Sequence, residues 1–441
     1  MTFQKNNEKI INAWCLYDWS NSVYSLVITS AIFPIYYQNI TTIKDSSGLI
    51  IKDTINFFGF EIVNSVLYSY LLSFSFLLIA AISPVLSSIA DYSGNKKLFM
   101  RIFCYIGAFS CSGLYFFTSD NITFSLIMFV LASIGFSGSI VFYNAYLPEI
   151  ATEDKFDKVS AKGFALGYTG SIILLVFNLS MILFPGVYGI SSSGLATRIS
   201  FLTVGLWWFG FAQYTFHYLP SNIYNKRSQG KFMLNGFKEL KKVLSELKKQ
   251  KLLKTFLLAF FFYNMGVQTV LYLATIFGDK ELGLSSELLI TTILVLQIVA
   301  IGGSYLFSFL SGKIGNIYAL MISIFFWITV SILAYFIKTA TEFIFVAGLV
   351  GLIMGGIQAL SRSTYAKIIP DNTTDHASYF SFYDVSEKIS IVIGTFVYGF
   401  INQVTGSMRV SSLILSLFFI TGLIFLSKIP SKNIYSIKIE S

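Results

Sequence analysis

Four charged side chains stand close together in a chain that is otherwise strongly apolar. Two apolar segments meet at a short polar turn around Pro370, and between them they carry Arg362, Asp384, Glu387 and Lys388. Asp384 and Lys388 have the spacing of an ion pair on one helix face, and both carboxylates are candidate partners for Arg362. The planar guanidinium of arginine suits a carboxylate-bearing ligand. It suits a salt bridge at a gate equally well, and both roles are compatible if the bridge opens and closes.

The first apolar segment has a polar stripe. With about 3.6 residues per helical turn, the members of the stripe fall on one face: Trp14, Asp18, Asn21, Ser22, Ser25 and Thr29. Asp18 suits the binding of a cationic group, or the carrying of a proton. A structural hydrogen bond, or a salt bridge to another helix, is the alternative.

Other apolar segments carry polar side chains that share a helical face or adjoin one. These are Ser133, Ser137 and Asn144, beside Tyr143; Asn264, Gln268 and Thr275; and Gly355, Gln358, Arg362 and Tyr365. Such groups suit hydrogen bonding to a small polar solute. They equally bond membrane helices to one another, each bond being worth about 0.6 kcal/mol. For any one of them, the structural role fits at least as well as ligand binding.

The turn after the second apolar segment, residues 87–97, has the residues of a mechanical gate. Gly94 permits a tight reversal, and Asp91 can accept hydrogen bonds from a helix end or pair with a nearby cation such as Lys96. The corresponding turn of the second half, residues 311–316, has no acidic residue. An ordinary charged loop is the alternative, but its position favours a gate.

Composition places the chain in a membrane. Hydrophobic residues make up 55% of the 441 residues, charged residues 12%, and the mean hydropathy is +0.70, more than a soluble globular protein needs. A net charge of +9 would suggest nucleic acid binding in a soluble protein. In a membrane protein it is explained by lysines and arginines on the cytoplasmic side, so we expect no nucleic acid partner. Cys15, Cys104 and Cys111 lack metal or disulfide spacing, and we expect no metal and no cofactor.

Twelve segments are long enough to cross the hydrocarbon core, which takes about twenty apolar residues. They lie near residues 11–38, 64–90, 98–118, 122–147, 163–185, 198–219, 255–278, 287–311, 317–337, 343–368, 377–403 and 410–428. We expect all of them to be helices, because lipid offers no partner to an unpaired backbone polar group. The first segment lacks a small-residue cleavage site, so we expect it to remain as a helix.

Positive charge predicts the orientation. With the N-terminus inside, most of the 31 lysines and arginines fall in inner segments, which puts both termini in the cytoplasm. The longest inner segment, residues 220–254, separates six spans at 1–219 from six spans at 255–441. Weak sequence echoes between the two parts favour two pseudo-symmetric six-helix bundles, the major facilitator arrangement. We expect an all-α membrane protein that is a monomer.

The linker segment contains a basic amphipathic helix. Its apolar face consists of Met233, Phe237, Leu240, Leu244 and Leu247, with lysines opposite. We expect this helix to lie against the anionic inner leaflet of the bilayer. A binding site for a partner protein is the alternative. The outer loop at residues 41–61 mixes apolar and charged residues, and is either an interfacial segment or a lid.

Several motifs together resemble one family. They are Tyr17-Asp-Trp-Ser-Asn-Ser-Val-Tyr24, Tyr143-Asn-Ala-Tyr-Leu-Pro-Glu149, Gly163-Phe-Ala-Leu-Gly-Tyr168, Gly355-Gly-Ile-Gln-Ala-Leu-Ser-Arg-Ser-Thr-Tyr365 and Phe382-Tyr-Asp-Val-Ser386. Over nearly its whole length the chain resembles the vacuole-effluxer-like branch of the major facilitator superfamily. The turn at 87–97 resembles the superfamily signature in part, with Ser87 and Asn95 in place of a glycine and an arginine. Glu387 stands where that branch has small glycines, so the resemblance does not carry Glu387.

The resemblance implies a secondary active transporter that works by alternating access. Bacterial members form the "unknown major facilitator" family, and fungal members are linked to amino-acid efflux from the vacuole during autophagy. We therefore expect a small polar solute as substrate, with amino acids as one candidate, and the bacterial inner membrane as the location. A lipid flippase of the same fold is the alternative. An enzyme is disfavoured, because the two histidines belong to no catalytic motif.

Two sites follow from these expectations. The substrate site is expected where the Asp18 stripe faces Asn264 and Gln268. The inner gate is expected at the charged hairpin around Arg362, together with the turn at Asp91. A coupling proton would ride on Asp18 or Asp384.

Overall fold

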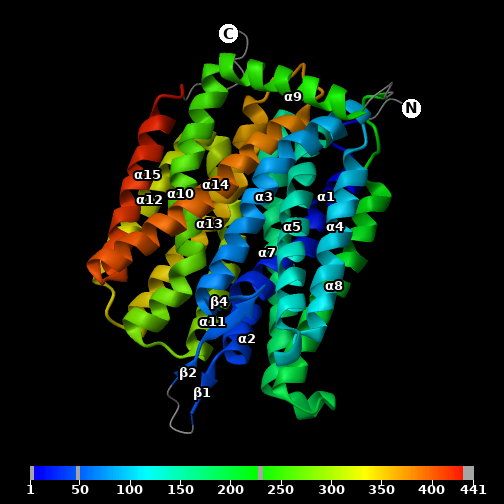
Figure 1. Ribbon diagram of the computed structural model, residues 1–441. Coiled ribbons are helices and arrows are strands. Elements are labelled where there is room, and N and C mark those ends of the chain that lie inside the picture. Colours follow the sequence, from blue (N-terminus) through cyan, green and yellow to red (C-terminus); the bar gives the residue numbers. More distant parts are fainter. Residues whose placement is uncertain (1–3, 46–49, 227–231, 431–441) are drawn as a thin grey trace.

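The computed structural model describes residues 4–45, 50–226 and 232–430. Long helices run side by side along one direction (Figure 1). The start of α1 (Glu8–Val23), the end of α15 (Met408–Ser427) and a helix that crosses the bundle lie at one end, which we call the terminal end. Short strands lie at the opposite end, which we call the hairpin end.

Helices account for most of the described chain. In what we call the N-half, residues 4–226, they are α1 (Glu8–Val23), α2 (Ile32–Thr41), α3 (Asn64–Ser93), α4 (Lys96–Gly113), α5 (Ile122–Ala145), α6 (Leu147–Ile150), α7 (Phe156–Leu183) and α8 (Ser193–Tyr218). In the C-half, residues 251–430, they are α10 (Lys251–Leu282), α11 (Ser286–Ile314), α12 (Asn316–Phe336), α13 (Ala340–Ile368), α14 (His376–Thr405) and α15 (Met408–Ser427). The crossing helix α9 (Phe232–Lys249) lies between the two halves in sequence.

All twelve predicted spans are helical where the structure describes them. Ten helices among the described residues are long and apolar enough to cross a membrane. The first predicted span is not a single α-helix, because a π-helical turn, Tyr24–Ala31, joins α1 to α2. The eleventh, α14, is unbroken over 30 residues but carries Asp384, Glu387 and Lys388, which lower its hydropathy.

Local sequence explains several helix ends. Asn7 caps α1 by accepting from the backbone N–H groups of Lys9 and Ile10, and Thr339 forms a capping box with Glu342 at the start of α13. Gly94 ends α3 with a left-handed φ of 69°, which a residue with a Cβ rarely adopts. The tight reversal expected at Gly94 is therefore present.

Glycines bring α13 close to α11. A Cβ added at Gly351 or Gly355 would collide with the backbone of α11 at Leu296 or Ala300. Gly348 of the same helix faces open space, so it does not serve close approach.

The crossing helix α9 packs on the terminal ends of α3 and α14 (Figure 1). Its Val243 is fully buried, whereas Leu244 is 37% exposed and Leu247 is partly buried. The side chains of Met233 and Phe237 lie outside the described residues. The face that contacts protein is thus centred one position away from the predicted apolar face, because α9 meets the protein through Val243 and leaves Leu244 outward.

The loop predicted at residues 41–61 contains two short antiparallel strand pairs at the hairpin end. The first pairs β1 (Ile43–Lys44) with β2 (Ile50–Lys52), and the second pairs β3 (Thr54–Phe57) with β4 (Phe60–Val63). The strands were not foreseen, since the apolar residues of this loop do not alternate regularly.

Candidate functional site

The guanidinium of Arg362 joins the two halves through an ion pair and several hydrogen bonds. It comes from α13 of the C-half and is only 3% exposed. Its Nη1 lies 3.2 Å from Oδ2 of Asp18 on α1. Its Nε donates to the hydroxyl of Ser160 and its Nη2 to the carbonyl of Ser160, both at 2.9 Å. A longer bond of 3.4 Å reaches Oδ1 of Asn144. Every one of these partners belongs to the N-half.

Asp18 is buried with its charge partly neutralised. The hydroxyl of Tyr143 donates to Oδ2 of Asp18 at 2.7 Å, the same oxygen that faces Arg362. A buried ion pair of this kind holds because both charges are satisfied; removing one partner typically costs about 3–5 kcal/mol. The pair therefore ties α1 to α13 only while the halves are in contact here.

Three aromatic rings surround the guanidinium, and we call Trp14, Tyr143 and Phe164 the aromatic cage. The Cζ atom of Arg362 lies 4.2 Å from the ring centre of Phe164, 4.8 Å from Trp14 and 5.4 Å from Tyr143. Each distance is within the range of cation–π attraction. The rings thus stabilise a planar cation at this place.

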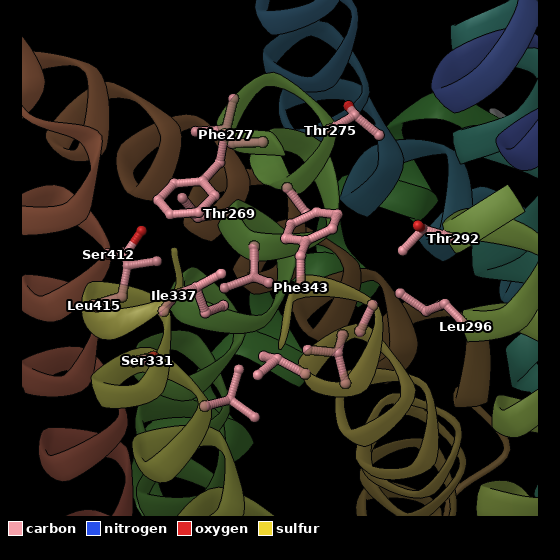
Figure 2. A pocket seen from close by; sticks show the side chains of 18 of the residues that line it. Thr269, Thr275, Phe277, Thr292, Leu296, Ser331, Ile337, Phe343, Ser412 and Leu415 are labelled. Atoms are coloured by element: carbon pink, nitrogen blue, oxygen red, sulfur yellow. The ribbon is translucent and has the colours of Figure 1, made fainter. Parts of the chain in front are cut away.

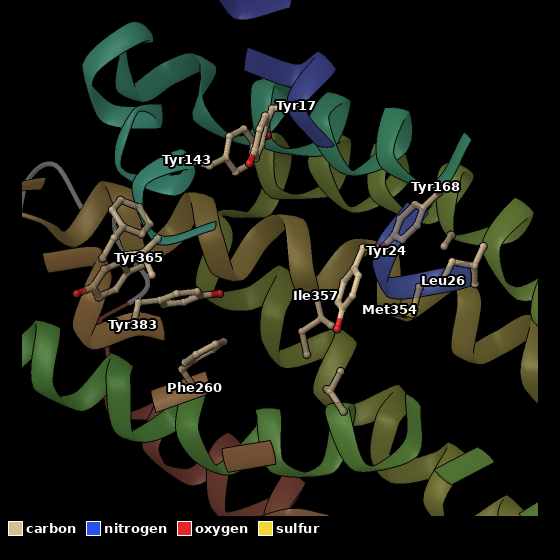
Figure 3. Packing of buried hydrophobic residues seen from close by; sticks show 14 of the residues in the cluster. Tyr17, Tyr24, Leu26, Tyr143, Tyr168, Phe260, Met354, Ile357, Tyr365 and Tyr383 are labelled. Atoms are coloured by element: carbon tan, nitrogen blue, oxygen red, sulfur yellow. The ribbon is translucent and has the colours of Figure 1, made fainter. Parts of the chain in front are cut away.

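The cage is embedded in buried aromatic packing on both sides of the site. Figure 3 shows Tyr17 and Tyr143 close together in the N-half, and Tyr365, Tyr383 and Phe260 grouped in the C-half. The ring centres are 5.2 Å apart for Tyr17 and Tyr143, and 4.1 Å apart for Phe260 and Tyr383. The charged pair is therefore enclosed by apolar rings, which exclude water and strengthen it.

Room for the pair depends on Gly163 of α7. A Cβ at this position would lie 2.6 Å from Oδ2 of Asp18 and 3.0 Å from Nη2 of Arg362. The first distance is shorter than real Cβ contacts, and the second is tighter than most of them. The glycine thus lets α7 approach closely enough for Ser160 to bind the guanidinium.

Further bonds between the halves flank the pair. The hydroxyl of Tyr168 donates to Oε1 of Gln358 at 2.6 Å, and the hydroxyl of Ser160 donates to the carbonyl of Ala359 at 2.8 Å. Together with Arg362 they join α7 to α13 along one face. Gln358 therefore contacts the N-half, as a residue of a closed interface.

Asp157 forms a second interface closer to the terminal end. It accepts from Lys367 at 2.7 Å, from the side-chain amide of Asn316 at 2.7 Å and from the hydroxyl of Ser311 at 2.9 Å. Asp157 lies at the start of α7, and its partners belong to the C-half. The turn at 311–316 has no acidic residue, and its Ser311 and Asn316 side chains instead bond to the carboxylate of Asp157 from the N-half.

Asp91 holds the N-terminus of α14. Its carboxylate accepts from the backbone N–H groups of Ala377 at 3.2 Å and Ser378 at 2.7 Å, and from the Ser378 hydroxyl at 2.8 Å. Helix N-termini attract anions because their first N–H groups are unpaired and their dipole is positive. Lys96 lies 3.5 Å from Asp91 and bonds to Glu149.

The linker is attached at the same end. Asp375, just before α14, pairs with Lys226 at 3.0 Å and with Lys242 of α9 at 3.2 Å. Burial raises the pKa of the Asp375 carboxyl, but a hydrogen bond with Glu239 and the charges of both lysines outweigh it and lower the pKa to about 2. The carboxylate is thus charged at neutral pH.

A family model described as "Vacuole effluxer Atg22 like" matches residues 6–433. The chain belongs to this family. A relative from Bacillus subtilis, named "Uncharacterized MFS-type transporter YxiO", is 33% identical over 424 residues, which cover 96% of this chain and 95% of the relative. Autophagy-related protein 22 of Saccharomyces cerevisiae is 24% identical over 505 residues, covering 98% of this chain and 93% of that protein.

Solved structures share the fold of this Atg22-like chain. The human organic anion transporter MFSD10 matches with a TM-score of 0.69 at 11% identity, covering 96% of this chain and all of that one. The transporter FucP in its outward conformation matches with a TM-score of 0.66 at 14% identity, covering 96% and 98%. The predicted family and the twelve-helix major facilitator fold are confirmed, and the chain is a multi-pass membrane transporter of that superfamily.

One predicted pairing in this Atg22-like chain is wrong. We expected Asp384 or Glu387 as the partner of Arg362, but Arg362 pairs with Asp18. Asp384 and Glu387 instead lie 3.4 Å and 3.2 Å from Lys388 on their own helix. The reason is that Arg362 extends from α13 toward the N-half, whereas the charges of α14 pair along their own helix.

The residues of the predicted substrate site take part in separate contacts, and the site itself stays a prediction. Asn264 donates to Ser390 at 2.7 Å and Gln268 to Glu387 at 3.3 Å, so both bond to α14 within the C-half. Of the Asp18 stripe, Asn21 is buried beside Ser22, which donates to it at 3.4 Å, while Ser25 is exposed. The structure thus brings together Asp18, Tyr143, Asn144 and Arg362, and separately the cluster on α14.

The C-half also contains an apolar cavity of about 90 Å³ (Figure 2). Phe277, Phe343 and Leu415 line it, with a few hydroxyl groups such as Thr292 and Ser331. All of its lining residues belong to the C-half, so it is distinct from the site around Arg362.

Three site residues escaped the sequence analysis. Ser160 and Asp157 lie in a charged run that reads as a loop, and Phe164 looks like ordinary packing. The only signal for them was their place in or next to the Gly163–Tyr168 motif.

Proposed function

We propose that this chain is a secondary active transporter that moves a small polar solute by alternating access, with the terminal end facing the cytoplasm. The observation that carries the proposal is the buried pair of Arg362 and Asp18. A charge buried in a membrane protein is costly unless it is paired, and this pair exists only when the halves touch. It therefore suits a gate that alternates between two states.

The flanking contacts support a state closed at the terminal end. Asp91 on the start of α14 and Asp157 on Lys367 join the halves there, beside the Arg362 pair. Lysines and arginines concentrate at the same end of the chain's spans, which supports a cytoplasmic location by the positive-inside rule. We infer that the closed end is the inner one and that the protein is located in the plasma membrane of a bacterium.

Amino acids are the first candidate substrates, because the resemblance to the vacuole-effluxer-like family implies amino-acid efflux and the model of that family matches this chain. A proton on Asp18 or Asp384 is the proposed coupling ion. A lipid-like solute is the second candidate, and the apolar cavity of the C-half favours it.

The test combines a ligand screen with transport. Purified protein is heated with amino acids, peptides, sugars, nucleosides and lysolipids, and a specific ligand is expected to raise the melting temperature by mass action. Uptake of the best ligand into proteoliposomes, with and without a pH gradient, then follows. If no member of these classes is both bound and transported, the proposal fails.

A distance measurement tests alternation without knowledge of the substrate. Lys158 of α7 and Lys313 of α11 are exposed at the terminal end and accept spin labels after replacement by cysteine. We expect Asp18→Asn to add a longer-distance population. A single unchanged distance in this variant would argue against a gate at this place.

A further inference from the structure

The receptor for the Arg362 guanidinium is built by one half alone. Asp18 and Trp14 come from α1, Tyr143 and Asn144 from α5, and Ser160 and Phe164 from α7. Only the cation itself comes from the C-half. When the halves separate at the terminal end, the receptor therefore stays with the N-half and loses its occupant.

The receptor does not need Arg362 to keep its shape. The indole of Trp14 donates to the carbonyl of Tyr143 at 2.8 Å, and the two rings stack with centres 4.4 Å apart. The Tyr143 hydroxyl holds Asp18 at 2.7 Å. A site that is organised before binding loses less entropy when a ligand enters.

The chemistry of the receptor is that of a site for an organic cation. It offers a carboxylate, a carbonyl, two side-chain oxygens and three ring faces, all of which attract a positive, planar or tetrahedral nitrogen group. Among the described residues, no second cation contacts these side chains. An anionic group would face Asp18 and the rings unfavourably.

We propose that this cage binds the ammonium or guanidinium group of a solute when the terminal end is open, and that Arg362 is a tethered competitor for the same place. The inference rests on the proposed transport function and names the chemical group that the site recognises. Solute and Arg362 exclude each other. A bound cation therefore favours the open state, and its departure lets Arg362 return and the terminal end close.

Chemical rescue tests the cage directly. In Arg362→Ala the cage is vacant and Asp18 is unpaired, so free guanidinium ion, at concentrations well below those that unfold proteins, is expected to raise the melting temperature. Urea, which has the same shape without charge, and sodium chloride at equal ionic strength are expected not to. Arg362→Gln serves as a second variant if the alanine variant does not fold.

Lys367→Ala is the matched control. Lys367 is another cation of α13 that pairs with an N-half acid, Asp157, but it makes no cation–π contact with a described residue. Guanidinium is expected not to rescue this variant. Phe164→Leu in the Arg362→Ala background keeps an apolar side chain but removes a ring, and is expected to weaken guanidinium binding about tenfold.

The wild-type protein gives the second measurement. With spin labels at positions 158 and 313, guanidinium is expected to increase the longer-distance population, and urea is not. The inference is overturned if Arg362→Ala responds equally to urea, if adding Asp18→Asn leaves the guanidinium response intact, or if Lys367→Ala is rescued as well. If guanidinium gives the expected responses but no solute is transported into proteoliposomes, the proposed function alone is contradicted.

Discussion

At the scale of the residue, the chain concentrates its buried charge where the halves touch. Arg362 donates to three N-half residues and lies among three rings. No other arginine in the described chain is paired this way across the two halves. Because each group here satisfies another, single substitutions leave an unpaired buried partner, and their effects are expected to be coupled.

A double-mutant cycle measures this coupling. Asp18→Asn and Arg362→Gln are each expected to destabilise the closed protein by about 3–5 kcal/mol, because each leaves a buried charge unpaired. The double variant is expected to be clearly more stable than the sum of both effects predicts. Thermal unfolding in detergent provides the measurement. Asp384→Asn is the control, and its effect on stability should add to that of Arg362→Gln. Energetic coupling between these two substitutions would argue that Arg362 pairs with Asp384, contrary to the structure.

Gly163 gives a prediction at the same scale. Gly163→Ala is expected to cost about 1–3 kcal/mol, because the added methyl group overlaps Asp18 and Arg362. Gly210 of α8, which has open space around it, is the control, and its replacement by alanine should be neutral or stabilising by up to about 1 kcal/mol. Melting temperatures compare the two. Equal effects would mean that the space at Gly163 is not needed.

At the scale of the element, helix ends rather than helix middles carry most of the terminal-end contacts. Asp91 holds the start of α14, Asp157 lies at the start of α7, and Asp375 fastens α9 beside α14. Each of these contacts involves only a few residues, but it joins elements that are far apart in the sequence. They can break together without disturbing the helices that carry them.

Asp375 provides a test of how α9 is held. Asp375→Asn removes the charge that pairs with Lys226 and Lys242, so amide hydrogen exchange in α9 is expected to become faster, with exchange in α5 unchanged. Exposed Asp154→Asn is the control. The same contact depends on pH: the lowered pKa of Asp375, about 2, means that its stabilisation is present above the ordinary value of about 3.9 and is lost as pH falls toward 2. Exchange in α9 that is unaffected by the substitution would contradict this attachment.

The elements themselves were largely predictable from the sequence, and their pairing was not. Long apolar runs predict membrane helices because lipid leaves no other choice. Which faces meet depends on helix rotation, and no local signal records it: Asp384 is near Arg362 in sequence, yet Asp18, 344 residues away, is its partner. For the same reason Val243 rather than Leu244 is the buried residue of α9. Asp157 was missed because an acid in a charged run looks solvated.

At the scale of the whole molecule, closure at the terminal end is asymmetric in charge. The N-half supplies the acids Asp18, Asp91 and Asp157, and the C-half supplies Arg362, Lys367 and the start of α14. The halves therefore meet as complementary surfaces. Each contact adds to the stability of the closed state, so the population of the open state should rise as contacts are removed.

The distance between labels at Lys158 and Lys313 measures this population. Asp91→Asn and Asp157→Asn are each expected to increase a small longer-distance fraction at least about fivefold, the effect of losing about 1–3 kcal/mol of charge-assisted hydrogen bonding. The pair of substitutions should do so more than either alone. Asp154→Asn again serves as the control. A distance distribution that is unchanged in Asp91→Asn, in Asp157→Asn and in the double variant would show that Asp91 and Asp157 do not set the equilibrium.

The π-helical turn Tyr24–Ala31 changes which side of the first span each later residue faces. A wide turn holds one residue more than an α-turn, so it shifts the angular phase of everything after it by about 100°. Before the turn, Asp18 is aimed at Arg362; after it, Tyr37 donates to the carbonyl of Asn64 at 2.7 Å. Deleting a single residue within the turn would leave both halves of the span helical, yet only one of these two anchors could remain in register. The inserted residue is thus what allows one span to serve two fixed attachments.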